Sequence, residues 1–283
     1  MKKTFSSRKS AFSLIELSIV LIIIGLLIAG ITGGASLIKS AELRNIVTEA
    51  RAHSVSVGAF YSLYDSFPGD SAVTLASGNV GDNDGQMEFC RNGTPAAAGT
   101  CPDAAPFSGS EGGAGAWLHM RDAGVFTFNS GTAIFGNGGN ATTRGNGVLG
   151  SAVAMSAGTS FPSSKTKQSG WVFDYDTVGL SNVAVLIGNI ITAPIGGTAA
   201  LSLATAPTTN VGRSITPADA LSVDAKNDDG VANAGRIKGG GTTGIATAVD
   251  ACFFTGSATY NVGNVTGKAC SLVYTLDVPG QGS

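Results

Sequence analysis

One acidic residue, Glu16, lies near the start of the most apolar stretch of this 283-residue chain. The stretch runs from Phe12 to Ile31 and has 15 apolar residues among its 20 positions. About 20 apolar residues are enough to cross a bilayer as a helix. A carboxylate inside such a span is costly and by default has a function and a partner, unless it simply reaches interfacial water. The residues around Glu16 are compatible with both interpretations.

The cysteines are the second group of residues that could be chemically active, and they lie at positions 90, 101, 252 and 270. Four cysteines allow three disulfide connectivities, and neighbours in the sequence favour Cys90–Cys101 and Cys252–Cys270. No C-x-x-C pair occurs, which disfavours zinc or thioredoxin-like chemistry. Because disulfides persist outside the cytoplasm, this pairing requires that part of the chain to lie there. Four free buried thiols are the alternative.

Two acidic clusters contain oxygen ligands of the kind that Ca²⁺ prefers, one around Gly85 and one before Gly230. Neither has the spacing of an EF-hand. Asp beside Gly is also common in turns that bind no metal, and Lys226 and Arg236 are alternative ion-pair partners for the second cluster. Ca²⁺ at each cluster is therefore a hypothesis, and no other cofactor is expected. The acidic residues are Asp82, Asp84 and Glu88 in the first cluster and Asp224, Asp228 and Asp229 in the second.

The composition argues against several other functions. The chain has 17 Lys+Arg against 19 Asp+Glu, so it lacks the basic charge of nucleic-acid-binding proteins. Its two histidines, His53 and His119, are too few for a multi-histidine metal site, and each is predicted to be a packing or surface residue. The G-x-G-x-x-G at Gly145–Gly150 follows no predicted strand, and no G-x-S-x-G occurs. The sequence therefore predicts a protein that is not an enzyme.

A basic, acid-free segment, residues 1–11, precedes the apolar stretch. Positive charge on that side of a membrane helix predicts a cytoplasmic N-terminus and places the following chain outside. A secretory signal peptide is the ordinary interpretation of such a start, and Gly33–Ala35 is the nearest cleavage site. The stretch exceeds the usual signal-peptide core of about 7–15 residues, and its pattern continues into a further helix, so a retained membrane helix is favoured.

The helical pattern extends well beyond the apolar stretch. Apolar residues recur at steps of three and four from Leu43 to Tyr64, and Pro68 ends the pattern. One helix is thus predicted from Phe12 to about Tyr64. Its first part, residues 12–34, suits lipid, whereas its second part, residues 35–64, suits docking on a globular domain.

Residues 65–283 are predicted to form that globular domain. Their short β-branched runs, separated by small polar residues and glycine, indicate strands. A helix followed by hairpin-type strands is typical of an α+β fold in which an antiparallel sheet packs on the helix. Trp117 and Trp171 are expected in the core. The predicted strands are Val125–Phe128, Trp171–Tyr175, Val183–Ile187, Ala251–Phe254 and Ser271–Leu276, with a helix at Ala114–Ala123 and loops at Gly136–Gly147 and Lys238–Gly244.

The N-terminal residues carry a family resemblance. The segment Ala11–Gly25, AFSLIELSIVLIIIG, closely resembles the cleavage and methylation segment of type IV pilins and type II secretion pseudopilins. The shared features are a short basic leader, a small residue before Phe, an acid at the fifth mature position and a long aliphatic run. The globular domain more weakly resembles a subgroup of bacterial pilin-like proteins, at Phe67–Asp70, Gly81–Gln86, Trp117 and Asp224–Gly230.

The resemblance implies a maturation step and an assembly contact. A prepilin peptidase is expected to remove residues 1–11 by cutting between Ala11 and Phe12, and the Phe12 amine is expected to be methylated. Glu16 is expected to pair with the Phe12 amine of a neighbouring subunit in a filament. Two positions depart from the family pattern, because Ala11 replaces the common glycine and Gly33 replaces a proline that many major pilins have.

The implied protein is a structural filament subunit with a pilin-like α+β fold, in which a long N-terminal helix spans the membrane with its first half and packs on an antiparallel sheet. The implied partners are identical or related pilin subunits, the prepilin peptidase and an inner-membrane assembly platform. The implied location is the bacterial inner membrane, then a pilus on the cell surface. Cys252–Cys270 resembles the disulfide-bounded region of type IV pilins. A type II secretion pseudopilin and a membrane-anchored adhesin or binding module that does not polymerise are the alternatives.

Overall fold

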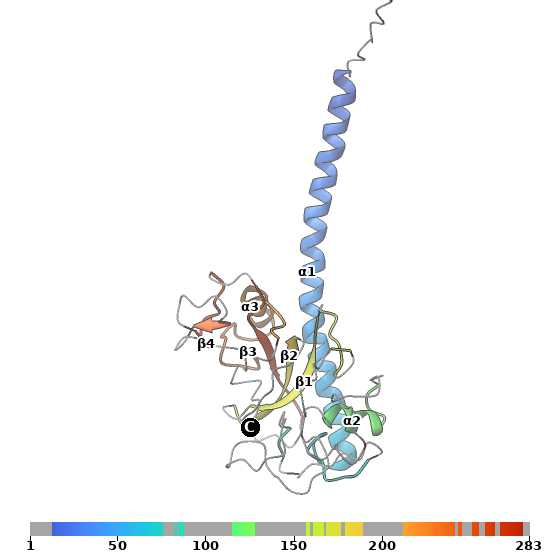
Figure 1. Cartoon of the computed structure of the whole chain (residues 1–283), viewed down its shortest axis with the longest axis vertical. Helices are drawn as coiled ribbons and strands as arrows, with labels where there is room; N and C mark the ends of the chain where they lie inside the picture. Colours follow the sequence, from blue (N-terminus) through green and yellow to red (C-terminus); the bar gives the residue numbers. More distant parts are fainter. Residues whose placement is uncertain are drawn as a thin grey trace, which may run out of the picture. The chain divides into compact units, whose positions relative to one another are not determined.

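The structure is a computed structural model that combines helices with an antiparallel sheet (Figure 1). It describes residues 13–75, 83, 85–87, 115–127, 157–158, 161–166, 168–176, 179–188, 212–240, 243–244, 251–254, 258–263 and 267–279. The chain divides into two compact units, Met1–Glu42 and Leu43–Ser283, and the second is called the head unit below.

Helix α1 spans Leu14–Tyr64 without a break and carries residues of both units. The helix ends where the sequence predicts, at Tyr64. The next residue, Asp65, has a left-handed φ of 52°, although its N–H still donates a hydrogen bond to the Tyr61 carbonyl at 2.8 Å, and Pro68 follows. The buried side chains of α1 begin at Ile46, later than the expected start of docking at residue 35. They recur with helical spacing, which makes one face of this part of α1 a core face of the head unit. The buried residues of α1 are Ile46, Val47, Ala50, His53, Ser54, Val57 and Phe60.

A four-stranded antiparallel sheet forms the centre of the head unit, in the order β1-β2-β6-β3. Three of the predicted strands are confirmed, with small differences at their ends. The strands are β1 Ser169–Asp176, β2 Ser181–Gly188, β3 Ile237–Gly240 and β6 Ser271–Thr275. A small parallel pair joins β4 Thr243–Gly244 to β5 Phe253–Phe254, which lies within the predicted strand Ala251–Phe254.

Both faces of the sheet are buried, and its two central strands, β2 and β6, consist mostly of apolar residues. Trp171, Leu186 and Leu272 are in register across three strands and share one face. Val172, Val185 and Val273 are the corresponding residues of the other face. The prediction that Trp117 and Trp171 belong to the core is confirmed, since each is 0% exposed.

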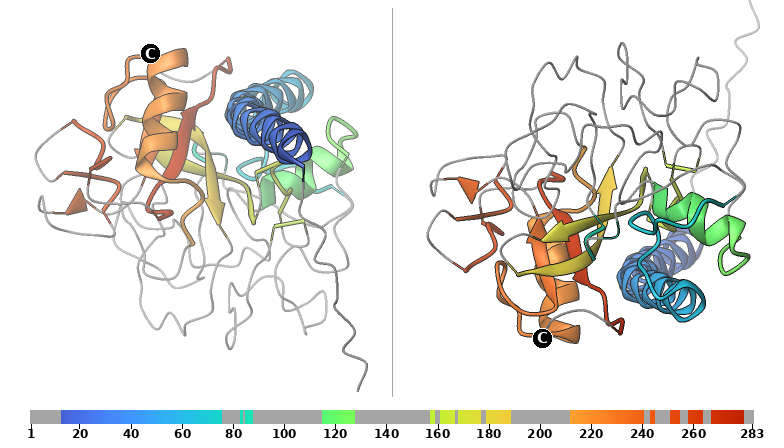
Figure 2. Two further views of the ribbon diagram at one scale, coloured as in Figure 1. Left: turned by 90° about the horizontal axis from the view of Figure 1, so that it is seen from above. Right: turned by 90° about the horizontal axis from the view of Figure 1, so that it is seen from below.

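Two further helices complete the described part of the head unit. Helix α2, Gly115–Asp122, matches the predicted short helix and lies alongside α1 in both views of Figure 2. Helix α3, Pro217–Asn227, lies alongside β3 and was not predicted. The Thr216 hydroxyl caps α3 by accepting a hydrogen bond from the Asp219 N–H at 3.2 Å, and Pro217 begins the helix. Thr-Pro-x-Asp is therefore the start signal that the sequence analysis missed.

Two predictions about strands and loops were wrong. Residues 125–127 form a turn after α2 rather than a strand, because the N–H groups of Val125 and Phe126 both donate to the Met120 carbonyl, at 3.0 and 3.2 Å. The predicted loop Lys238–Gly244 contains β3 residues and β4, because Gly239 pairs with Leu272 in the sheet. Phe128 and the predicted loop Gly136–Gly147 lie outside the described residues.

Candidate functional site

The first turn of α1 places Glu16 in a capping box. The Glu16 Oε2 atom accepts a hydrogen bond from the Ser13 backbone N–H at 2.9 Å, and the Ser13 Oγ lies 3.4 Å from the Ile15 nitrogen. Ser13 and Glu16 thus have the S-x-x-E spacing in which a helix cap and the third helical residue satisfy free N–H groups. A carboxylate is also favoured at a helix N-terminus by the helix dipole. This partner was not anticipated, although its spacing is visible in the sequence.

The turns after Glu16 present aliphatic side chains on every side of the helix. From Leu17 to Ile38, the exposed fractions of the large aliphatic side chains lie between 46% for Ile24 and 73% for Leu37. The polar side chains there bond within the helix: Ser18 Oγ donates to the Ile15 carbonyl at 2.9 Å, and Thr32 Oγ1 to the Ile28 carbonyl at 3.0 Å. By length and composition, α1 is able to cross a membrane. Such a surface requires a cover of lipid or of other apolar helices.

Gly33 and Gly34 lie within the continuous part of α1. A Cβ atom built at either residue meets no atom within 4 Å outside the local helix backbone. Local unwinding at these residues, which the sequence allows, is absent from the described helix. The two glycines nevertheless keep this turn narrow and weaken it, because each costs about 1 kcal/mol relative to alanine.

Another carboxylate of α1, Glu49, lies in the head unit and bonds that part of the helix to the 164–171 region. Its Oε2 atom accepts hydrogen bonds from the Ser164 hydroxyl at 2.6 Å and from the Trp171 Nε1–H at 2.9 Å. Its Oε1 atom accepts the Lys165 backbone N–H at 2.9 Å. One turn later, Ser54 Oγ accepts the N–H of Asp277 at 3.0 Å. No local sequence signal identifies Glu49, because its partners lie 115–122 residues away.

The two C-terminal cysteines are joined, as their positions in the sequence favoured. Cys252 and Cys270 form a disulfide that closes a segment of 18 residues, and both are 0% exposed. Cys90 and Cys101 lie outside the described residues. The disulfide lies close to the sheet: a Cβ atom on Gly239 would lie 2.9 Å from the Cys252 sulfur and 2.7 Å from the Tyr260 ring. Glycine is thus required at this position of β3.

The second acidic cluster gathers at the end of α3. One carboxylate oxygen from each of Asp224, Asp228 and Asp229 lies within 4.8 Å of the others. The Asp224 carboxylate accepts hydrogen bonds from the Tyr260 hydroxyl at 2.8 Å and from the Gly230 N–H at 3.1 Å. These bonds give the buried member of the cluster a structural role. Ca²⁺ binding by the three acids stays a prediction, and Asp82 and Asp84 of the first cluster lie outside the described residues.

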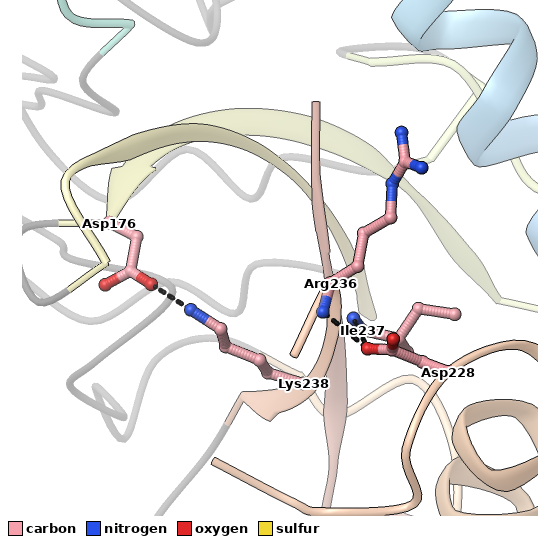
Figure 3. Close-up of polar contacts among 5 residues, drawn as sticks. All are labelled: Asp176, Asp228, Arg236, Ile237 and Lys238. Carbon is pink, nitrogen blue, oxygen red and sulfur yellow. Dashed lines mark hydrogen bonds and ion pairs between the residues drawn. The ribbon is translucent and has the colours of Figure 1, made fainter. Parts of the chain in front are cut away.

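Figure 3 shows how the neighbouring acid, Asp228, holds the start of β3. Its carboxylate accepts hydrogen bonds from the backbone N–H groups of Arg236 and of Ile237, the latter at 2.9 Å. The Arg236 guanidinium pairs with Asp277 at 2.9 Å, so it is not the counter-ion of the cluster. In the same figure, Lys238 pairs with Asp176 at 2.9 Å and links the edge strand β3 to the end of the edge strand β1.

Burial changes the proton affinity of the pair between Asp224 and Tyr260. Burial raises the pKa of Asp224, and the hydrogen bond from Tyr260 partly opposes this change. The pKa of Tyr260 is raised well above its ordinary range, first by burial and then by the charge of Asp224. Tyr260 therefore stays a hydrogen-bond donor at all accessible pH values, and it connects α3 to the segment bounded by the disulfide.

The two histidines are packing residues, one of the alternatives predicted for them. His119 is 0% exposed, and its Nδ1 accepts the Gly69 N–H at 2.9 Å. His53 is 6% exposed and is enclosed by aromatic rings of β1 and of the α2 segment. Ala11 and Phe12, the predicted cleavage site, lie outside the described residues.

Comparison with known proteins adds one finding at the N-terminus. Residues 6–32 match the family described as the prokaryotic N-terminal methylation motif. No curated protein and no solved structure matches the chain. The motif marks type IV pilins and pseudopilins, which are generally structural proteins rather than enzymes. It implies processing by a prepilin peptidase at the inner membrane, followed by transfer to a surface or secretion apparatus. The chain is a prepilin-like protein that carries the N-terminal methylation motif of the type IV pilin and pseudopilin family.

Proposed function

We propose that this chain is the subunit of a type IV pilus-type filament. The observation that carries the proposal is the methylation motif at residues 6–32, followed directly by turns of α1 with exposed aliphatic side chains. Such a helix is stored in the membrane and then exchanges lipid for the helices of neighbouring subunits. The filament core is formed by the N-terminal part of α1, and the head unit lies outside the core.

Maturation creates the group that Glu16 recognises. Cleavage between Ala11 and Phe12 leaves a positively charged amine on Phe12, which is then methylated. Within the described residues, the Glu16 carboxylate accepts one hydrogen bond, from the Ser13 N–H. A buried carboxylate without a counter-charge is strongly unfavourable in an apolar bundle. Pairing with the Phe12 amine of another subunit neutralises both charges, and only subunits with the correct axial stagger bring them together.

Two alternative functions, a type II secretion pseudopilin and a membrane-anchored adhesin, use the same kind of N-terminal segment and are distinguishable from a pilus subunit. A type II secretion pseudopilin shares cleavage, methylation and the acid, and differs in the length and location of the filament. The disulfide Cys252–Cys270 and the long region that follows α1 support a pilus subunit over a pseudopilin. A membrane-anchored adhesin that does not polymerise has no use for Glu16 in an apolar span, so the acid favours assembly.

Substitution of Glu16 tests the proposal, because charge and capping are separable there. Glu16→Gln keeps an oxygen that accepts the Ser13 N–H but removes the charge, whereas Glu16→Leu removes both. Both variants are expected to be cleaved normally and to reach the membrane but to fail in filament assembly. Filaments are counted by electron microscopy of cell surfaces, and the mature N-terminus is measured by mass spectrometry.

The controls separate a failure of assembly from a failure of the protein. Glu42→Gln, a substitution later in α1, is expected to assemble as the unmodified chain does. Normal filament numbers with Glu16→Leu would refute the role of Glu16. A mature chain that begins after Gly33–Ala35, or that keeps Met1, would refute the filament proposal itself.

A further inference from the structure

His53 occupies an unusual position in the head unit. It lies on the core face of α1, and four aromatic rings surround its imidazole with edge contacts between interplanar angles of 65° and 83°. The centroid distances are 5.0 Å to Trp117, 5.8 Å to Phe126, 5.5 Å to Trp171 and 6.4 Å to Phe173. Neither ring nitrogen has a hydrogen-bond partner among the described residues. The four rings are called the aromatic box below.

The box joins three elements through a single side chain. Trp117 belongs to α2, Phe126 to the turn after it, and Trp171 to β1. The Trp117 Nε1–H donates to the Trp171 carbonyl at 3.1 Å, so α2 and β1 are also bonded to each other beside His53. A change in the charge of His53 therefore affects how α2 and β1 both pack against α1.

Charged groups near the box are already engaged. On α1, Glu49 lies one turn before His53, and its carboxylate accepts three hydrogen bonds from the 164–171 region. On β1, Asp174 and Asp176 alternate with Trp171 and Phe173, so they point to the opposite face of the sheet. On α2, His119 stacks on Phe60 at 5.8 Å and accepts the Gly69 N–H.

The last residues of α2 are engaged as well. Arg121 pairs with the adjacent Asp122 at 2.8 Å. None of the charged groups that the structure describes on these elements is placed to accept a hydrogen bond from a protonated His53.

We propose that His53 makes the head unit acid-sensitive: the aromatic box holds the neutral imidazole, and protonation of His53 loosens α2 and β1 from α1. An imidazolium carries two N–H donors and needs acceptors or water for both. The described residues of the box supply no hydrogen-bond acceptor for either donor. The attraction of a cation to ring faces is weaker than the cost of burying an ion without a partner.

The sign and size of the effect follow from proton linkage. Burial lowers the pKa of His53 from its ordinary value of 6.5 to about 4. The folded state therefore binds this proton less readily than the unfolded chain does, so the contribution of His53 is present above pH 6.5 and is lost as the pH falls. The ratio of folded to unfolded molecules falls about 30-fold from this residue alone at pH 5, and about 150-fold at pH 4. This inference goes beyond filament assembly and does not depend on it.

The experiment uses the full chain in detergent micelles and a fluorescence signal that the sequence provides. The chain has 2 Trp residues, Trp117 and Trp171, and both contact His53. Urea unfolding is followed by tryptophan fluorescence at pH 7 and pH 5, in the unmodified chain and in His53→Leu. Leucine has a similar volume and does not titrate. Carboxylates and His119 are common to both chains, so their contributions cancel in the difference.

Between pH 7 and pH 5, the folding equilibrium constant of the unmodified chain is expected to fall about 20-fold more than that of His53→Leu. Equal losses in the two chains would overturn the proposal. If His53→Leu does not fold, the titration midpoint of the His53 imidazole is measured by NMR in the unmodified chain. A titration midpoint below 6.5 supports the proposal. A midpoint at or above 6.5 overturns it and means that the ring faces stabilise the imidazolium.

Discussion

The contact between Glu49 and the 164–171 region is predicted to be among the most important single contributions to the stability of the head unit. Glu49→Ala removes three hydrogen bonds to a carboxylate at once. The Trp171 indole is 0% exposed, so its Nε1–H would be left buried without an acceptor. An orphaned buried donor costs about 1–3 kcal/mol, and hydrogen bonds to a charged group contribute about 1.5–3 kcal/mol each.

The energies of the three hydrogen bonds are not additive, because all three end on one carboxylate. At the exposed Lys165, water also replaces the hydrogen bond that the substitution removes. We expect Glu49→Ala to lower the free energy of unfolding by about 3–5 kcal/mol. Glu49→Gln is expected to cost less, about 1–2 kcal/mol. The single amide oxygen of the glutamine side chain can still accept hydrogen bonds from Ser164 and Trp171. Its NH₂ group, however, faces the Lys165 N–H, and two donors cannot form a hydrogen bond with each other.

The assay is urea unfolding of the full chain in micelles at pH 7, followed by circular dichroism and tryptophan fluorescence. Glu42→Gln, which changes the same charge on the same helix outside the head unit, is the matched control and should change the free energy by less than about 0.5 kcal/mol. A loss below about 1 kcal/mol for Glu49→Ala, or an equal loss for the Gln and Ala variants, would refute the hydrogen-bond assignment.

Two other predictions concern the C-terminal part of the head unit. Tyr260→Phe is expected to lower the free energy of unfolding at pH 7 by about 1.5–3 kcal/mol, because it removes the donor to a buried carboxylate. The loss should shrink in acid, where Asp224 is protonated in both states, and a loss that is constant in urea titrations from pH 7 to pH 3 would contradict it. Reduction of Cys252–Cys270, which closes 18 residues, is expected to cost about 3 kcal/mol by loop entropy. Urea midpoints of the reduced, alkylated chain and of the oxidised chain measure this cost, and equal midpoints would exclude it.

The elements that the sequence identified are those whose signals are local. The helix α1 was predicted because its apolar residues repeat with helical spacing up to Tyr64, where Pro68 follows. Strands β1 and β2 were predicted because Trp171–Tyr175 and Val183–Ile187 are short hydrophobic runs with β-branched or aromatic residues, bounded by small polar residues and glycine. Glu16 was identified because the residues around it form a continuous motif, which needs no knowledge of the fold.

The elements that were missed depend on tertiary contacts. Strand β3 contains Gly239 and Gly240, and two glycines in sequence predict a loop. Gly239 is present because Tyr260 and Cys252 approach its backbone too closely for a side chain, and that approach cannot be seen along the chain. Helix α3 is short and its polar residues obscure its periodicity, so only the capping signal at Thr216, which was missed, could have identified it. The partners of Glu49 lie more than a hundred residues away.

Glu16 and Glu49, two of the carboxylates of α1, show how one helix serves two purposes. A carboxylate has about four positions at which it can accept hydrogen bonds. Glu49 has three of them filled by its own chain, so it fixes a structure within the subunit and has little capacity left for a partner. Glu16 has one filled, by the Ser13 N–H of its own first turn. Once lipid or neighbouring helices remove water, that difference leaves Glu16 dependent on a donor from another molecule. In the filament that we propose, this unused capacity, together with its charge, suits Glu16 for setting the register between subunits.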